Sequence, residues 1–422
     1  RVSSLQTQPE PRWRRGRKLM LYRVAIMLIL FLLGGCSTLG SSNVEPTAVV
    51  RAQNEIAENQ LLDVGIEVFD PGVVTDDQAD KRGQSAEIRK AESIYMSTQL
   101  KRTLQGTGHW GSVWVVPDAA DSVDVLVTGR IVSSSGEHLG LEIDARDATG
   151  RPWLQESYTL VAEDGFYTNL EPGEDPYHDL YNTIANDLLA VRDILQSEQI
   201  RDIRRVSQLR FASDLSPDPY ADYLDQGKDG SLQAIRLPAA DDPMMERMME
   251  VREREYLLFD GVNEHYAYLY DEMEPAYDNW RKYQFAEASN LRKVERDAWI
   301  RRAMGVAAIL GGVAVGVSGN DSNSAAMRDL MIIGGTAAFI SGSNLAQEAD
   351  IHAEAIRELS VSFEEEVTPQ VIEVEGQTLK LTGTAEQQYA KWREILRQIY
   401  YEETGFEPGQ PIRAYDAPAT DI

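Results

Sequence analysis

The chain is poor in the residues that build covalent or metal-bound structure. It has one cysteine, Cys36, in 422 residues, which excludes an internal disulfide and a cysteine-based metal site. It also lacks a phosphate-binding loop and a nucleophile elbow, and no two histidines stand at metal-ligand spacing. We therefore expect no metal, no cofactor beyond a covalent modification, and no enzymatic activity. The five histidines are scattered along the chain: His109, His138, His178, His265 and His352.

Positive charge is scarce as well. The formal net charge is −27, and residues 1–35 hold seven basic residues and one acidic residue, so the chain from Cys36 onward carries −33. Such a surface repels phosphate backbones and anionic lipid headgroups. This excludes nucleic acid as an expected partner, while the length allows two or three domains.

Apolar runs as long as a membrane-spanning helix are missing too. A shorter apolar run lies just before Cys36. If translation begins at Met20, a short basic segment (20–23) precedes an apolar run (24–33), two glycines and Cys36. This is the layout of a secretory signal peptide. An uncleaved membrane anchor would need ~20 apolar residues, more than this run contains. We expect residues 1–35 to be upstream residues and a signal peptide.

The residues around the cysteine are specific in type. Leu33-Gly34-Gly35-Cys36 resembles the lipobox of bacterial lipoproteins. That resemblance implies cleavage before Cys36, a diacylglyceryl group on its thiol and an acyl chain on the new amino terminus. No aspartate follows the cysteine, which in the enterobacterial members implies the outer membrane. We expect an outer-membrane anchor, a lipidated tether at 36–58 and the bulk of the chain in the periplasm.

Residues 59–200 have the pattern of an α+β domain. Val125, Val127 and Ile131 show period-two spacing, as do Leu139 and Leu141, which is typical of strands with one buried face. Turn residues separate the segments. The expected strands are 61–69, 112–116, 123–133, 138–146 and 153–161, and the expected helices are 86–104 and 177–195.

Two short motifs link this domain to a known family. Phe69-Asp70-Pro71 closes the first strand, and Asp124-Val125-Leu126-Val127-Thr128-Gly129 begins a later one. The layout resembles the periplasmic domain of the curli secretion lipoprotein, which implies a similar mixed fold and a role in secretion. The long amphipathic β-hairpin with which that family builds a pore has no counterpart in this sequence.

The second half of the chain is predicted to be mainly helical. Residues 201–243 are expected to be a linker or wrapped loop, because 213–243 are rich in Asp, Pro and Gly. Apolar residues at spacings of three and four predict a long helix over 244–302 that needs a partner: a helix at 347–367, one at 385–403, or a neighbouring subunit. Residues 371–374 and 378–381 predict a β-hairpin within the returning region 347–422. The apolar face consists of Phe259, Val262, Tyr266, Leu269, Met273, Tyr277 and Trp280.

Residues 303–346 form a second helical pattern of a different kind. Two uncharged arms, 304–317 and 331–346, flank a polar loop, and small residues recur at every fourth position of each arm. Such stripes let helices approach closely in lipid, and the segment resembles the glycine-zipper hairpins of small outer-membrane lipoproteins. The alternative is a hairpin packed inside the protein, since an arm of about 21 Å is short for a bilayer core of ~30 Å. The stripe comprises Ala308, Gly312, Gly316, Gly334, Ala338 and Gly342, and Trp299, Arg301 and Arg302 precede it as an expected interfacial belt.

Three other groups have a structural and a functional interpretation. His178 and Asp179 with Glu174 and Asp175 are more typical of a solvated acidic loop than of a site. The run 364–366 is more typical of an exposed helix end than of a calcium site. The tyrosines between 266 and 283 are more typical of core and helix packing than of a surface that binds glycan or a partner.

These patterns predict a non-enzymatic, homo-oligomeric outer-membrane lipoprotein. It would be a scaffold or part of an export or envelope complex, with membrane lipid and copies of itself as partners. The alternative is a binding module that its tether brings to a periplasmic partner such as a peptidoglycan synthase.

Overall fold

A computed structural model gives the fold. It describes residues 41–43, 45–73, 86–117, 122–163, 165–168, 170, 173–239, 241–315, 351, 354–355, 357–358, 370–374, 377–381 and 384–405. Of residues 41–43, 218, 221, 291, 294–315, 370–374 and 377–380 it describes only the backbone. The expected signal peptide, the expected lipid site Cys36, the run 364–366 and most of the expected helix 347–367 lie outside this set. So do the stripe residues Gly316, Gly334, Ala338 and Gly342.

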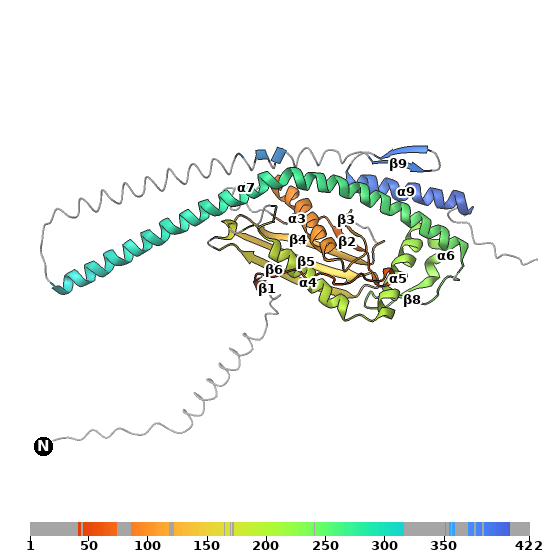
Figure 1. Ribbon diagram of the computed structural model, residues 1–422, viewed down its shortest axis with the longest axis horizontal. Helices are drawn as coiled ribbons and strands as arrows, with labels where there is room; N and C mark the ends of the chain where they lie inside the picture. The colour runs from red at the N-terminus through yellow and green to blue at the C-terminus, as the bar shows by residue number, and fades with distance from the viewer. Residues whose placement is uncertain are drawn as a thin grey trace, which may run out of the picture. The chain divides into compact units, whose positions relative to one another are not determined.

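A mixed six-stranded sheet forms the first part of the fold, with strand order β1-β6-β5-β4-β2-β3 (Figure 1). β2 is parallel to both β3 and β4, whereas β4, β5 and β6 form an antiparallel meander. Every strand expected between 59 and 200 is present, with ends shifted by a few residues. The strands are β1 (Ser41–Asn43), β2 (Val64–Glu67), β3 (Val113–Val116), β4 (Val125–Ser134), β5 (His138–Asp147) and β6 (Pro152–Val161).

Two helices cover one face of this sheet. α3 (Ala86–Thr107) makes the crossover between β2 and β3, and α4 (His178–Asp193) follows β6. The alternating residues Val125, Val127 and Ile131 of β4 face these helices and are buried. The opposite face of the meander carries polar and charged side chains such as Arg130 and Glu142, which form an ion pair. The fold class is α+β, as expected.

The structure corrects the expectation of a linker at 201–243. Its first part is the second half of α5 (Ser197–Leu215), whose Ile203, Val206 and Phe211 are buried. Apolar residues at spacings of three give α5 a face that must be covered, so it packs rather than spans. The remainder holds short elements, and only the stretches between them have the expected loop character. These elements are α6 (Pro217–Tyr220), η3 (Ala221–Tyr223), β7 (Leu224–Gln226) and β8 (Leu232–Ala234).

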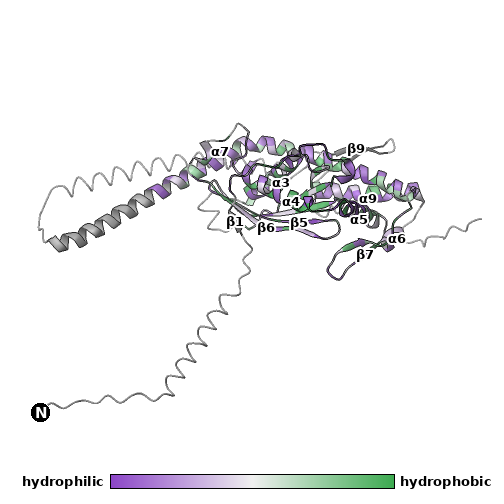
Figure 2. Ribbon diagram, turned by 60° about the horizontal axis from the view of Figure 1, so that its bottom comes forward, coloured by the Kyte–Doolittle hydropathy of each residue, from purple (hydrophilic) through white to green (hydrophobic). Residues whose placement is uncertain are grey.

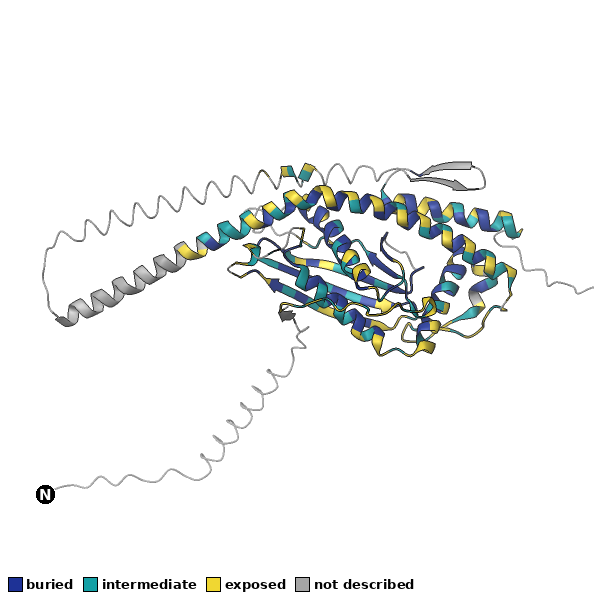
Figure 3. Cartoon of the chain, viewed as in Figure 1, coloured by how far each residue is buried: buried dark blue, intermediate teal, exposed yellow. Residues whose placement is uncertain are grey.

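The expected long helix is present and is longer than predicted. α7 begins at Pro243 and ends at Val315 without interruption at the expected boundary near 302. Figure 2 shows hydrophobic and hydrophilic turns alternating along it, and Figure 3 shows buried and exposed residues alternating where it lies against the sheet domain. Among the described residues, no helix has an apolar stretch long enough to cross a membrane.

The carboxyl-terminal elements also follow the prediction. β9 (Gln370–Val374) and β10 (Gln377–Leu381) form the expected antiparallel hairpin. α9 (Ala385–Thr404) follows it, with Thr384 capping its first turn, and packs against α7 as one of the proposed partners. A second core forms here between β3, α5, α7 and α9, with Trp114, Phe259 and Trp392 among its buried residues.

Candidate functional site: the docking interface of the long helix

The most elaborate polar chemistry in the described residues lies where α7 meets the sheet domain. α7 inserts Tyr270, Met273, Tyr277 and Trp280 into the same core as the strands. It also buries three charged side chains, Arg252, Glu255 and Arg281. A buried charge is costly unless it is paired and hydrogen-bonded, so we followed each one to its partners. Together these contacts define the docking interface.

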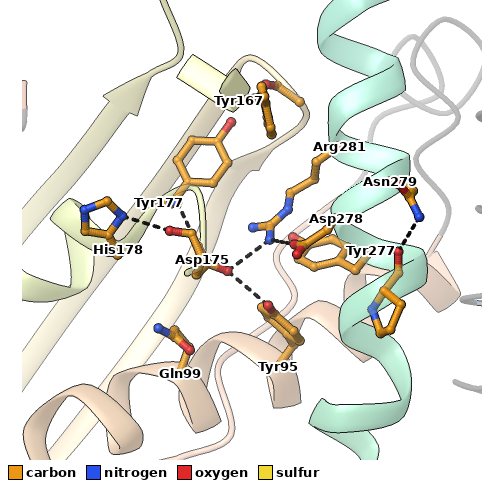
Figure 4. A network of polar contacts seen from close by, with 12 residues as sticks. Tyr95, Gln99, Tyr167, Asp175, Tyr177, His178, Tyr277, Asp278, Asn279 and Arg281 are labelled. Atoms are coloured by element: carbon orange, nitrogen blue, oxygen red, sulfur yellow. Dashed lines mark hydrogen bonds and ion pairs between the residues drawn. The ribbon is translucent and has the colours of Figure 1, made fainter. Parts of the chain in front are cut away.

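Arg281 forms the central ion pair of this interface. Its Nη2 lies 3.0 Å from Oδ2 of Asp175, and the side chains are 1% and 0% exposed. Figure 4 shows Asp175 receiving bonds from several directions: Tyr95 Oη donates to the same oxygen at 3.0 Å, and the backbone N of Tyr177 donates to Oδ1 at 2.7 Å. The carboxylate is therefore fully engaged, and it joins α3, α7 and the residues before α4.

Aromatic rings surround the guanidinium of Arg281. Its Cζ lies 4.1 Å from the ring centroid of Tyr277 and 5.6 to 5.7 Å from those of Tyr177 and Tyr95. Cation–π contacts of this kind strengthen when they are desolvated. Burial is the largest single effect and lowers the pKa of Arg281, but Asp175 and its other acidic neighbours together raise it by more, so the net pKa lies well above its ordinary value. Arg281 is therefore a fixed positive charge in the core.

A second carboxylate, Glu92 of α3, is fully buried next to this cage. Its Oε1 accepts bonds from Tyr277 Oη at 2.8 Å and Ser134 Oγ at 2.5 Å, and Arg89 lies beside its other oxygen at 3.3 Å. Burial, followed by the nearby Glu92 charge, raises the pKa of Tyr277 well above 10.0. The tyrosine thus keeps its proton and acts as a hydrogen-bond donor at physiological pH.

Tyr95 and Tyr270 connect α3 to α7 by a stacked pair. Their ring centroids are 4.3 Å apart, and Tyr270 Oη donates to Gln99 Oε1 at 2.7 Å. Burial, followed by the Asp175 charge, raises the pKa of Tyr95 well above 10.0. On the outer side, Arg102 lies 3.9 Å from the ring centroid of Tyr270, so this pair has aromatic, polar and cationic neighbours.

The other two buried charges lie nearer the start of α7. Arg252 Nη2 donates to Ser207 Oγ of α5 at 2.6 Å and lies 3.9 Å from Oδ1 of Asp124. Burial raises the pKa of Asp124, and Arg252 opposes that rise. Glu255 Oε1 accepts bonds from Arg393 Nη1 at 2.8 Å and from Tyr389 Oη at 3.1 Å, both on α9. Three different elements thus fix the register of α7, which is the best-attested use of buried ionic groups.

α7 also covers the free edge of the sheet. Val115 of edge strand β3 donates its backbone N–H to Asn263 Oδ1 at 2.9 Å, and Asn263 Nδ2 donates to its carbonyl at 2.8 Å. The adjacent Trp114 donates its indole N–H to Asp260 at 2.8 Å. An uncovered edge strand is a template for pairing with other chains, so α7 protects this one.

The expected tether contains a segment that is held in place, which corrects the expectation of a tether throughout 36–58. We call residues 47–52 the strap. Its Thr47 N donates to Asp179 Oδ1 at 2.8 Å, and Val50 N donates to Asn186 Oδ1 at 2.9 Å. Asn182 Nδ2 donates to Thr47 O at 2.9 Å and Asn186 Nδ2 to the carbonyl of residue 48 at 3.0 Å. β1 (Ser41–Asn43), which precedes the strap, is also held, because it pairs with β6 in the sheet.

The structure places two groups of the candidate residues from the sequence. Trp299, Arg301, Arg302, Ala308 and Gly312 lie on α7, where only the backbone is described. The tyrosines Tyr266, Tyr270 and Tyr277 are buried, which confirms the packing interpretation, whereas Tyr268 is 58% exposed. No group of side chains within the described residues has the composition and geometry to hold a metal ion.

The interpretation of 174–179 as a solvated loop is wrong for Asp175. His178 and Glu174 are partly exposed, with His178 Nε2 3.5 Å from Glu174 and 3.4 Å from Asp179, but Asp175 is buried against Arg281. The strap and the Asp175–Arg281 pair are the features that sequence reasoning missed.

Comparison with known proteins adds no relative. The chain matches no protein-family model, and neither the curated proteins nor the solved structures give a match. The conclusions below therefore depend on the residues and on the geometry of the docking interface.

Proposed function

We propose that this chain is a non-enzymatic outer-membrane lipoprotein, lipidated on Cys36, that assembles with copies of itself into a membrane-embedded scaffold. In this proposal the α+β domain lies in the periplasm, α7 is the stalk, and the apolar segment 303–346 associates in the bilayer through its small-residue stripe. Such an assembly serves as a platform or as part of an export or envelope complex.

One observation carries this proposal. α7 is a single helix that is fixed by buried ion pairs at Arg252, Glu255 and Arg281 and continues through the stripe positions Ala308 and Gly312. A rigid helix transmits position along its length, so association at the stripe would hold the domains in one relative arrangement. This supports a scaffold over a domain that moves freely on a flexible tether.

The strap supports the same choice. Because β1 (Ser41–Asn43) pairs with β6 and the strap is bonded to α4, the chain that could act as a tether ends before residue 41. Even fully extended, the chain from Cys36 to Ser41 would span at most about 18 Å at roughly 3.5 Å per residue. A lipid-anchored domain would therefore stay close to its own membrane, which does not favour the alternative of a long-reaching binding module.

The first test separates the lipid from the apolar segment as membrane anchors. We would export the Cys36→Ser chain with an ordinary signal peptide, wash the membranes with high salt and size the detergent extract. We expect the variant to stay in the membrane fraction and to migrate as a large discrete particle. Release as a soluble monomer would contradict the proposal and favour the tethered binding module.

The second test addresses the assembly contact. Gly312→Leu together with Gly342→Leu should reduce the particle to monomers, because leucine prevents close approach of two helix backbones. Val313→Leu with Phe339→Leu is the matched control on the neighbouring positions and should leave the particle intact. Since leucine favours helix formation over glycine by roughly 0.5–1 kcal/mol, loss of the particle would not reflect loss of the helix.

A further inference from the structure

The two edges of the six-stranded sheet differ in how they are covered. At one edge, Asn263 of α7 bonds both backbone groups of Val115 in β3. At the other, the three-residue β1 pairs with β6, which has ten residues. A strand of three residues leaves most of a ten-residue edge without a partner strand. Among the described strands, no other lies beside this edge of β6.

β1 covers the part of β6 near its end. Asn43 is only four residues before Thr47, a distance of at most about 14 Å at roughly 3.5 Å per residue. Thr47 bonds to Asp179 in the first turn of α4. That turn adjoins the connection between β4 and β5, because Tyr177 Oη donates to the carbonyl of Ser135 at 3.0 Å. Since β6 ends opposite the first residue of β5, β1 lies at the same end of the sheet.

The uncovered stretch therefore lies nearer the start of β6. Gln155 and Glu156 are both exposed there. The first residues of the strand are protected in another way, by Pro152 and by a register shift opposite it, two features that blunt an edge strand. The open stretch is 154–157, which we call the open edge.

The backbone bonds show which groups the open edge presents. Ala162 N donates to the carbonyl of Glu137 at 2.8 Å, and this pair continues the unbroken register of 154–161 against β5. Along an antiparallel pair, residues that bond to the neighbouring strand alternate with residues that do not. The even-numbered residues from 154 to 160 therefore bond to β5, and Gln155 and Ser157 direct their N–H and carbonyl groups outward. Such a row of groups is a template for one more strand.

The side chains beside the open edge are acidic. Glu156 is on the helix-covered face of β6 with Leu154 and Tyr158, because side chains alternate along a strand. Tyr158 Oη donates to Asp187 Oδ2 of α4 at 2.8 Å, which places a second carboxylate above the same stretch. An added strand would set one residue directly opposite Glu156 in a non-hydrogen-bonded pair, where side chains lie closest. Lysine or arginine at that place would meet a carboxylate, and the net charge of −27 attracts a cationic segment.

We infer that the open edge is a strand-addition site for an extended segment of a partner protein that carries lysine or arginine opposite Glu156. Backbone bonds at Gln155 and Ser157 provide the affinity, and the carboxylates of Glu156 and Asp187 select a cationic partner. A second copy fits less well, because two β6 strands would bring like charges together. The inference is independent of the lipid and of the small-residue stripe in the proposed function.

The first experiment tests the geometry on the full-length chain in mild detergent, without any ligand. Hydrogen exchange is slow where an amide is bonded within a sheet and fast where it faces solvent. We expect the Gln155 amide to exchange about tenfold or more faster than the amides of Leu154 and Glu156, which bond to β5. A Gln155 amide as slow as its two neighbours would show that this edge is covered, and it would overturn the inference.

The second experiment tests binding with a designed probe. A blocked, dye-labelled decapeptide of alternating threonine and lysine places its lysines on one face and can set one of them opposite Glu156. We expect it to bind the full-length chain in a fluorescence-anisotropy titration and to slow exchange of the Gln155 amide. The same peptide N-methylated at its threonines keeps its charge but loses the donors that face the open edge, so it should bind about tenfold more weakly. Equal affinity of the two peptides, or no binding of either, would overturn strand addition.

The third experiment changes the open edge itself. Gln155→Pro removes an N–H that β5 does not use, which an edge strand tolerates, and it should weaken binding of the threonine–lysine peptide about tenfold. Gln155→Thr keeps that N–H and is the matched control, with affinity close to that of the wild type. Equal affinities of the two variants would overturn the role of the Gln155 backbone.

A charge reversal keeps the test decisive even if the proline variant does not fold. Glu156→Lys should weaken binding of the threonine–lysine peptide about fivefold and strengthen binding of a threonine–glutamate peptide. Glu264 of α7 is also exposed, so Glu264→Lys makes the same change in net charge away from β6 and should leave both affinities close to those of the wild type. Equal effects of the two lysine variants would mean attraction by net charge alone, and the inferred site would be wrong.

Discussion

Asn263 of α7 forms two hydrogen bonds with the backbone of Val115 on edge strand β3: its Oδ1 accepts from the N–H at 2.9 Å and its Nδ2 donates to the carbonyl at 2.8 Å. A primary amide offers one acceptor and two donors, and so it occupies the place of a neighbouring strand. Asn263 Nδ2 also donates to the carbonyl of Phe259 at 2.7 Å, which fixes its orientation. One side chain thus ends the sheet and attaches the long helix to it.

Replacing this amide should destabilise the fold. Asn263→Leu leaves the N–H and carbonyl of Val115 buried without partners, and such groups cost about 1–3 kcal/mol each. We expect the free energy of unfolding, measured with urea, to fall by about 2–4 kcal/mol. Asp260→Asn, one turn earlier, keeps an oxygen for the Trp114 indole and is the control. A loss no larger than in the control would contradict the edge-covering role.

The buried Arg281–Asp175 pair should show strong coupling. Arg281→Met leaves Asp175 as an uncompensated buried charge, and breaking such a pair costs about 3–5 kcal/mol. Asp175→Asn in the same chain removes that charge and should restore part of the loss, which a double-mutant cycle measures. Arg130→Met breaks an exposed pair with Glu142 and should change stability little. Additive effects of the two buried substitutions would contradict the coupling.

The sequence predicted the sheet domain well because its signals are local. The alternation of Val125, Val127 and Ile131 follows from one covered face, and turn residues mark the ends of each strand. The helix α5 was missed although Ile200, Ile203 and Val206 provide the required spacing. The composition of the region that follows it indicated a linker and concealed that signal.

The docking interface and the strap had no local signal to detect. Asp175 and Arg281 are 106 residues apart, and an aspartate between Glu174 and Pro176 has the same sequence pattern whether it is solvated or buried. The strap is bonded through its backbone, which every residue carries, and the small and polar residues around it indicated a tether. Only the fold shows that Asn182 and Asn186 face it.

Burial of His265 predicts a loss of stability in acid. Burial lowers the pKa of His265 below its ordinary value of 6.5, so the unfolded chain binds this proton more readily than the folded one. The contribution of neutral His265 to the free energy of unfolding is complete above pH 6.5. It is lost as the pH falls from there toward the folded pKa, by at most about 1.4 kcal/mol per pH unit. His265→Gln should flatten this slope in urea titrations. Above pH 8 variant and wild type should show the same pH dependence, and a slope that the substitution leaves unchanged below pH 6.5 would contradict the assignment.

Gly136 provides a steric test of how closely α7 approaches the sheet domain. A Cβ at this position would lie 2.1 Å from the carbonyl oxygen of Arg281 and 2.5 Å from the backbone N of Phe285. These are helix backbone atoms and cannot rotate away, so Gly136→Ala must push α7 outward.

We expect Gly136→Ala to cost about 1–3 kcal/mol, as overpacking does, and to increase protease cleavage of α7 between 281 and 293. Gly106 near the end of α3 has open space around its position, so Gly106→Ala should be neutral or stabilise by up to about 1 kcal/mol through helix propensity. The two substitutions make the same chemical change. A difference in sign between them, measured by urea unfolding, would therefore report the contact with α7. If Gly136→Ala left both stability and cleavage unchanged, the helix would not lie against this turn, and the rigid coupling from which the scaffold is argued would fail with it.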